Sequence, residues 1–460
     1  MPSGKEIVQY LYDVCQRFEI LDKIQMDTSV KVMRWIEQDE EWELVLEHLA
    51  PGIGDLSTAE RRKIEQEQGP KAAVFKTEIV RAKIVCSAVG GLVEPKPQID
   101  VPGLDQFEGK IIHTARWDPN IDLKNKDIVV VGTGCSAGQV IPQLIKPEYG
   151  AKHVTQLLRS PPWAVPFLSP EASETWRKWM PFCCTYIPGL QYTLRKLMFA
   201  MVELEFISLF TPNEAARNRR AKKAKEVLGY LRRTAPEEYH EILTPDYELF
   251  CKRRVVDEGW FRALQNPNVE LTSLPLTSIQ PKTVTLGPGR HYPPMSKTNS
   301  TAPTAEKTIP ADIIILANGY ETNTWLHPLE VHGRNDTSLD RVWESRGGAQ
   351  AYLGTAMDGF PNFFMIFGPN TATGHSSVIL ASENMVNYAL NFIRPILDGH
   401  VRTYEVKESA ERAWTEQLQN ELKNSVFLSG GCRSWYNAPN GWNSTVYRKC
   451  PSPGRVFSLI

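Results

Sequence analysis

A glycine-rich loop directly after a short apolar strand constrains this chain more than any other feature. Residues 127–131 read DIVVV, and residues 132–138 read GTGCSAG. In such a turn the first glycine allows a tight bend, the second lets backbone N–H groups approach a pyrophosphate, and a small third residue lets the helix pack on the strand. A helix predicted over 136–145 and a strand over 153–158 complete a βαβ unit of about thirty residues, a context that argues against a turn without a ligand. The predicted dinucleotide ligands are Gly132, Thr133, Gly134, Cys135, Ser136, Ala137, Gly138 and Gln139.

The end of the second strand indicates which dinucleotide binds. An NAD site places Asp or Glu there to accept from the ribose hydroxyls, whereas this chain has Arg159 and Ser160. A guanidinium and a hydroxyl are donors that suit a ribose 2′-phosphate. We therefore expect NADPH in preference to NADH; an arginine that only caps the sheet edge is the alternative.

Composition excludes several other classes of protein. With 460 residues the chain is too long for one compact core, so two domains or a bilobal unit is expected. A formal net charge of −1 argues against nucleic acid as a partner. The 8 cysteines contain no CxxC pair, which predicts reduced thiols in a cytoplasmic protein with no metal site. The most apolar window, 192–210, contains four charged residues and is a poor membrane span; a helix on the protein body is favoured over one on a membrane surface.

Strand and helix patterns alternate along the chain and predict an α/β fold. Apolar periodicity predicts a helix over 5–20, strands over 28–37, 42–48, 72–77 and 81–88, and a helical insertion over 161–250. Strands are expected at 269–276 and 283–286, a surface loop at 288–310, a buried strand at 311–317 and a long helix at 377–397.

A second motif precedes the glycine-rich loop. Residues 107–118 follow the pattern FxGxxxHxxxWD, with His113, Trp117 and Asp118 at its fixed positions. By spacing alone, His113 and Trp117 could share one packed face of a helix or turn. The string, however, resembles the fingerprint of the Baeyer–Villiger monooxygenases at every fixed position. The resemblance implies two Rossmann-like domains that bind FAD and NADPH, a reaction of O2 with a ketone to give an ester or lactone, and His and Trp residues that couple cofactor movement to catalysis.

Further segments extend the resemblance over nearly the whole chain. Residues 250–254, FCKRR, with Gly259 and Trp260 after them, are similar to the family's active-site arginine segment. The resemblance implies that Lys252 joins Arg159 and Ser160 on the 2′-phosphate and that Arg253 stabilises the negative charge formed during oxygen transfer. Arg254 is a weaker candidate for this charge-stabilising role, because adjacent side chains of an extended chain point apart. A solvated basic edge is the alternative for the whole run.

The remaining matched segments are those that imply flavin contacts and the type of family member. Residues 317–320 (ANGY) resemble the return to the FAD domain, with Asn318 in place of the more frequent Thr. Residues 361–370 and 374–378 resemble the last flavin-contacting segment, and 434–436 and 441–444 the tail of fungal-type members. The implied flavin-binding residues are Gly90, Gly91, Gly368 and Val378.

The family's first glycine-rich loop, which should hold the FAD pyrophosphate, is not found in residues 1–120. Gly52-Ile-Gly54 lies in a loop, and Gly90-Gly91 lacks the third small position. We therefore expect a chain that lacks the N-terminal FAD-binding βαβ unit, with truncation favoured over a genuine short protein. The expected division is 1–120 and 312–460 for FAD, and 121–311 for NADP. The function indicated is Baeyer–Villiger oxidation of a small ketone in fungal secondary metabolism; an N- or S-hydroxylating flavin monooxygenase and a catalytically impaired NADP-binding fragment are the alternatives.

Overall fold

The computed structural model describes residues 4–96, 99–166, 170–288, 305–322, 324–374 and 377–447, without the side chains of 170–174 and 177. The chain divides into two compact units, of which unit 1 comprises 1–84 and 327–339 and unit 2 the rest. The division expected from the sequence, at residues 121 and 312, stays a prediction.

Unit 1 is built on a four-stranded sheet in the order β15-β1-β2-β3. Strands β1 (Thr28–Ile36), β2 (Glu41–Leu49) and β3 (Val74–Ala82) are antiparallel neighbours, and β15 (Glu330–His332) joins β1 in parallel. Trp42 is completely buried beside Trp35, in an edge-to-face pair with ring centroids 5.7 Å apart. The sequence placed the end of the third strand at residue 77, whereas pairing with β2 extends β3 to Ala82. The helical elements of unit 1 are α1 (Gly4–Arg17), η1 (Leu21–Lys23), α2 (Thr58–Gln68), η2 (Pro70–Ala72) and η5 (Arg334–Asp336).

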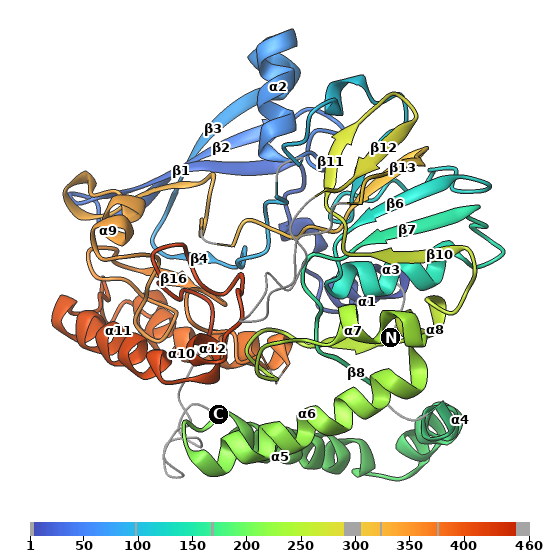
Figure 1. Cartoon of the computed structure of the whole chain (residues 1–460). Helices are drawn as coiled ribbons and strands as arrows, with labels where there is room; N and C mark the ends of the chain where they lie inside the picture. The colour runs from blue at the N-terminus through green and yellow to red at the C-terminus, as the bar shows by residue number, and fades with distance from the viewer. Residues whose placement is uncertain are drawn as a thin grey trace. The chain divides into compact units, whose positions relative to one another are not determined.

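Unit 2 contains a five-stranded parallel sheet in the order β10-β7-β6-β14-β5 (Figure 1). Its central strand β6 (Asp127–Val131) and the helix α3 (Cys135–Leu144) that follows confirm the βαβ unit predicted from the glycine-rich loop. The other strands are β5 (Lys110–His113), β7 (His153–Leu157), β10 (Val269–Thr272) and β14 (Ile313–Leu316).

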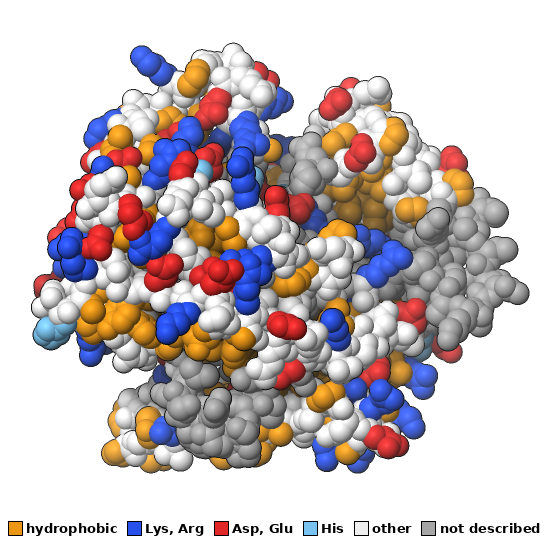
Figure 2. Space-filling view, turned by 90° about the vertical axis from the view of Figure 1, so that its left-hand side faces the viewer, with side chains coloured by type: hydrophobic (Ala, Val, Ile, Leu, Met, Phe, Trp, Pro, Cys, Tyr) orange, Lys and Arg blue, Asp and Glu red, His pale blue; other side chains and the backbone are white. Residues whose placement is uncertain are grey.

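Long helices follow the second strand of the βαβ unit, as predicted. They are α4 (Pro170–Tyr186), α5 (Leu190–Phe210) and α6 (Glu214–Thr234). In Figure 1 α5 and α6 run beside each other along the lower end of the molecule, and at that level Figure 2 shows both hydrophobic and basic side chains. Shorter elements follow: η4 (Glu237–Tyr239), α7 (His240–Leu243), α8 (Trp260–Ala263) and the parallel pair β8 (Ala164–Pro166) and β9 (Val255–Asp257).

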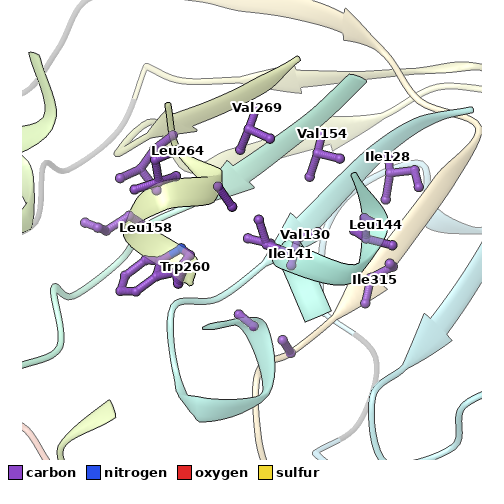
Figure 3. Close-up of a cluster of buried hydrophobic side chains, with 14 of the residues drawn as sticks. Ile128, Val130, Ile141, Leu144, Val154, Leu158, Trp260, Leu264, Val269 and Ile315 are labelled. Atoms are coloured by element: carbon purple, nitrogen blue, oxygen red, sulfur yellow. The ribbon is translucent and has the colours of Figure 1, made fainter. Parts of the chain in front are cut away.

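The core of the parallel sheet is formed by α3 and α8 packed on one face. Figure 3 shows Ile141 and Leu144 of α3 beside Val130 and Ile128 of β6, with Trp260 close to Leu158. Burial of such side chains, at about 1.5–3 kcal/mol each relative to exposure, fixes the loop between β6 and α3 against the sheet.

A three-stranded antiparallel sheet corrects one expectation. Strands β11 (Leu276–Ile279), β12 (Thr283–Leu286) and β13 (Lys307–Pro310) are neighbours in that order, and η3 (Leu104–Gln106) lies near β11. The sequence predicted a loop over 288–310, and residues 289–304 lie outside the described part. Residues 307–310 instead pair with β12, because Ile309 is buried against Val284.

A short parallel pair, β4 (Val85–Ser87) and β16 (Phe363–Met365), forms a separate sheet. The backbone N–H of Ile366 donates to the carbonyl of Ser87 at 2.7 Å, so the chain leaves both strands at the same edge. The helices that complete the unit are α9 (Leu339–Ser345), α10 (Val378–Leu397), α11 (Glu408–Lys423) and α12 (Val426–Ser429).

Candidate functional site

Most of the residues predicted to bind NADPH lie at the carboxyl edge of the parallel sheet. Gly132 follows β6 directly, Arg159 lies two positions after the end of β7, and β5 ends at His113. The strand order places β7 on one side of β6 and β14 on the other, and the crevice at such a change of direction is where α/β sheets bind ligands. A cleft lined by Lys110, Asp312 and their neighbours lies instead at the amino ends of β5 and β14.

The glycine-rich loop has the geometry of a phosphate-binding turn. Gly132 has φ 121°, and a Cβ there would lie 2.5 Å from the carbonyl oxygen of Ala317, so only glycine fits. Gly134 caps α3, and a Cβ there would meet no atom within 4 Å. The space beside Gly134 is therefore open at the N-terminus of α3, a helix end of the kind that binds a pyrophosphate.

Two buried side chains hold this loop in place: Gln156, which the sequence did not indicate, and Thr133, which it predicted as a dinucleotide ligand. Gln156 is completely buried; its amide donates to the Gly132 carbonyl at 2.9 Å and its oxygen accepts from the Trp260 indole at 2.8 Å. Thr133 Oγ1 donates to the carbonyl of Ser160 at 3.0 Å. The loop is thus tied to β7 and to α8 before any ligand binds.

The three donors expected at the 2′-phosphate are brought together. Lys252 Nζ donates to Ser160 Oγ at 2.6 Å and lies 4.6 Å from the centroid of the Tyr247 ring. Burial, and then repulsion from Arg159, lower the pKa of Lys252 to about 8. Two cations held close enough to repel each other fit a dianionic group, which would relieve that repulsion.

The arginines after Lys252 differ in environment. Arg253 is exposed, whereas Arg254 is half-buried with its guanidinium 4.5 Å from the centroid of the Phe250 ring and 4.0 Å from the Glu205 carboxylate. Desolvation lowers the pKa of Arg254. Arg254 is therefore engaged in packing, and Arg253 is the member of the pair whose side chain extends to solvent.

A disulfide between Cys251 and Cys432 corrects the prediction that all the cysteines are reduced thiols. The two residues are 181 positions apart, so no spacing motif could have revealed them. Close approach of the two segments is visible at Gly430, where a Cβ would lie 2.9 Å from Cys251 Cβ. The described free cysteines are Cys15, Cys86, Cys135, Cys183 and Cys184.

Tyr436 also connects the segment after α12 to residues 250–254, a contact that the sequence did not predict. Its hydroxyl lies near the backbone of Arg253, and its ring packs edge-on against Phe427 at a centroid distance of 5.9 Å. Burial raises the pKa of Tyr436 to about 12. The chain leading into these contacts is unusual, because Phe250 adopts φ 75°, a left-handed conformation that costs a bulky residue about 1–3 kcal/mol.

The FxGxxxHxxxWD motif connects two strands of the parallel sheet. His113 Nδ1 accepts from the Ala115 backbone at 3.0 Å, so the proton is assigned to Nε2, which donates to the Gly319 carbonyl at 3.1 Å. Burial lowers the pKa of His113, which favours this neutral form. Trp117 is 37% exposed, and Asp118 accepts from the backbone N–H of Asn120 at 2.9 Å. His113 thus joins the end of β5 to the segment after β14, while Trp117 and Asp118 lie on the following turn.

The residues expected to contact the flavin lie around the carboxyl edge of β4 and β16. Gly91 faces the Trp325 ring, with a Cβ position 3.0 Å away, and Gly368 lies where a Cβ would be 2.4 Å from the Gly354 carbonyl. Gly90 has φ 70°, and Val378 is the first residue of α10. His375 and Ser376, part of the same predicted segment, lie outside the described residues.

An orphaned polar atom lies at this second edge. Ser87 Oγ is buried and has no hydrogen-bond partner within the part of the chain that the structure describes. A buried hydroxyl without a partner is costly, and a ligand with polar groups at this edge would satisfy it. The residues therefore fit a second polar cofactor here. In the described ranges no cluster of His, Cys, Asp or Glu could hold a metal ion.

Solved structures with the same fold contain bound dinucleotides. The chain matches a structure titled OTEMO complex with FAD and NADP at a TM-score of 0.72 and 20% identity, covering 100% of this chain and 83% of that one. It matches oxidized steroid monooxygenase bound to NADP at a TM-score of 0.69 and 24% identity, covering 96% and 80%. The fold is therefore that of a flavoprotein monooxygenase with two dinucleotide-binding domains.

Sequence relatives define the family. A Baeyer–Villiger monooxygenase of Streptomyces coelicolor is 30% identical over 97% of this chain and 75% of the relative. The FAD-binding monooxygenase ktnD of Aspergillus niger is 29% identical over 97% of this chain and 67% of its own length. No family model matches the chain. At this identity and coverage, the chain belongs to the Baeyer–Villiger monooxygenase family.

Proposed function

We propose that this protein uses FAD, NADPH and O2 to insert one oxygen atom beside a ketone carbonyl, giving an ester or a lactone. The observation that carries the proposal is the grouping of Lys252 and Ser160 beside Arg159, next to the glycine-rich loop and one residue before Arg253. A nucleotide phosphate site and an exposed cation thus share one short segment of chain.

The residues at the carboxyl edge of the parallel sheet would hold NADPH. The N-terminus of α3 offers backbone N–H groups to the pyrophosphate, and Arg159, Ser160 and Lys252 offer donors to the 2′-phosphate. Cys135, Ser136 and Gln139 at the start of α3 line the same turn. Gly90, Gly91, Gly368 and Val378, with Ser87, would hold FAD at the other edge.

Arg253 would act on the reaction itself. When bound, NADPH supplies the hydride and FAD the oxygen-transfer chemistry. Attack on a carbonyl places negative charge on oxygen, and the guanidinium of Arg253, which is exposed in this structure, would stabilise that charge once bound cofactor and substrate exclude water from it. The neutral His113 at the end of β5, with Trp117 and Asp118 on the turn that follows, would couple the position of the cofactor to that step.

We further propose a fungal-type role in which the substrate is a ketone of secondary metabolism. Support comes from the tail, where residues 434–436 and 441–444 resemble fungal members, and from the likeness to FAD-binding monooxygenases of Aspergillus niger and Aspergillus terreus.

The NADPH assignment is tested by titration of the wild type and of Arg159→Ala with NADPH and with NADH. A charge-assisted hydrogen bond contributes about 1.5–3 kcal/mol, so the variant should bind NADPH about ten- to a hundredfold more weakly. Its affinity for NADH should not change. Arg262→Ala, at an exposed arginine of α8, is the matched control. Equal affinities of the wild type for the two nucleotides would contradict the assignment.

The reaction is tested by product mass. With FAD, NADPH and isotopically labelled O2, a ketone should gain one labelled oxygen and become an ester or lactone. Conversion of amines or thioethers, with ketones unchanged, would contradict the proposal and indicate heteroatom hydroxylation.

A further inference from the structure

The helices α4 and α5 carry an apolar surface that the nucleotide sites do not use. On α4 the exposed stripe is Trp179, Phe182 and Tyr186, spaced i, i+3 and i+7, and the last two rings lie 4.5 Å apart. On α5 the stripe is Leu197, Met201 and Leu204, spaced i, i+4 and i+7. These six residues are each between 54% and 68% exposed. We call them the hairpin stripes.

The α5 stripe lies opposite the side by which that helix is packed. Phe206, Leu209 and Phe210 are buried in the core beside Phe427, whereas Met201 and Leu204 point away from it by helical geometry. The helix is therefore anchored on one side and apolar on the other. An exposed apolar surface of this extent is uncommon on a protein that has no partner there.

Lysines accompany the aromatic residues of this surface. Lys178 Nζ lies 5.8 Å from the centroid of the Trp179 ring, and Lys196 Nζ lies 4.7 Å from that of Tyr192. Tryptophan and tyrosine suit the boundary between lipid and water, where an apolar ring and a polar tip are both satisfied. A lysine beside such a ring extends its charge to the level of lipid head groups while its stem stays on apolar surface.

The next helix supplies a positive charge that the whole chain does not have. Residues 170–234, which span α4 to α6, contain 12 Lys and Arg and 6 Glu, a net charge of +6, although the chain as a whole carries −1. On α6, Arg217, Arg219, Lys222, Lys223 and Lys225 are exposed, while Ala216 and Val227 face the core. The lower end of Figure 2, where α5 and α6 lie in Figure 1, shows blue and orange side chains together.

We propose that the α4–α5 hairpin and α6 dock this protein on the surface of an anionic lipid bilayer, with the hairpin stripes entering the head-group region. The combination of an apolar face, interfacial aromatic residues and flanking basic charge is that of a helix lying on a membrane. The chain would lie on the bilayer by these helices, since none of the described helices is long and apolar enough to cross one.

Charge distinguishes this occupant from a second copy of the chain. A symmetric dimer through the hairpin would bring the same basic helix of both copies to one interface, and like charges there repel. Anionic lipid gives attraction instead, at about a fivefold gain in binding for each basic residue near the surface.

Vesicle sedimentation of the full chain tests the proposal. The protein should pellet with vesicles rich in phosphatidylglycerol, pellet much less with pure phosphatidylcholine, and be released as salt rises. Trp179→Ser with Leu204→Ser should lower binding at least about tenfold, because both side chains would lose apolar burial in the bilayer. Lys222→Glu with Lys223→Glu should do the same through charge.

Matched controls use exposed residues of unit 1. Phe75→Ser with Ile79→Ser removes side chains that are each 63% exposed on β3, and Lys63→Glu with Lys71→Glu repeats the charge reversal. Both controls should bind vesicles like the wild type, and thermal melting should show all four variants folded. Absence of vesicle binding by the wild type would overturn the proposal. So would a dimer in sedimentation velocity that dissociates in Trp179→Ser with Leu204→Ser while vesicle binding is unchanged.

Discussion

We expect the charge of Lys252 to respond to pH more than that of the other phosphate-site residues. The affinity of the protein for NADPH should change with it. Burial and Arg159 lower the pKa of Lys252 to about 8, whereas a bound phosphate favours its charged form. Below the pKa of the free protein the ammonium is already present; above it, binding must take up a proton. NADPH affinity should therefore fall as pH rises from about 7 to about 9, with NADH affinity nearly constant.

Calorimetric titration at several pH values checks this expectation. Lys252→Arg is the informative variant, because a guanidinium keeps its charge across the range and should flatten the NADPH profile. A wild-type profile as flat as that of Lys252→Arg would contradict the role of Lys252 at the phosphate.

Arg253 and Arg254 make a matched pair, because they are neighbours with different surroundings. Arg253→Ala should lower ester or lactone formation by a factor of about a hundred to a thousand, the usual loss for one donor to a developing oxyanion. Arg254→Ala should mainly lower the melting temperature, since its guanidinium lies against the Phe250 ring. Product formation with FAD and NADPH, followed beside thermal melting, distinguishes the two. If Arg254→Ala lost the product and Arg253→Ala kept it, the assignment would be off by one position.

At the scale of elements, the arginine segment is held by the chain that follows α12. The disulfide from Cys251 to Cys432 and the nearby Tyr436 hydroxyl connect residues 250–254 to this segment. Cys432→Ser should lower the free energy of unfolding by about 2–4 kcal/mol and weaken NADPH binding through Lys252. Cys184→Ser, at a free and half-buried cysteine, is the control. Identical melting of Cys432→Ser and the wild type would contradict this account.

The sequence predicted those elements whose signals are local. The strand β6, the glycine-rich loop and α3 form one continuous pattern, and the donors Arg159 and Ser160 follow the next strand directly. What it missed depends on distant partners. Strand β13 contains a lysine and a proline and is a strand because β12 pairs with it. The disulfide and the contacts of Gln156 and Tyr436 join residues that lie 24 to 183 positions apart in the sequence. No spacing rule covers such separations.

At the scale of the whole molecule, the nucleotide edge of the parallel sheet belongs to unit 2 and the four-stranded sheet to unit 1. Trp42 and Trp260 are both completely buried, but they lie in different units and in different networks. Trp42 packs on Trp35 in unit 1. Trp260 donates to Gln156, which in turn holds the carbonyl of Gly132 in the glycine-rich loop.

Replacing each tryptophan by alanine should therefore have separable effects. Such a cavity typically costs about 3–5 kcal/mol. Trp42→Ala should lower the unfolding transition of unit 1 and leave NADPH affinity intact, because no part of the glycine-rich loop depends on it. Trp260→Ala should lower the transition of unit 2 and also weaken NADPH binding, because it removes the hydrogen bond that orients Gln156. In calorimetry, added NADPH should raise only the transition that Trp260→Ala lowers, since a ligand stabilises the unit that binds it. One transition, shifted equally by both substitutions and by NADPH, would show that the two units unfold together.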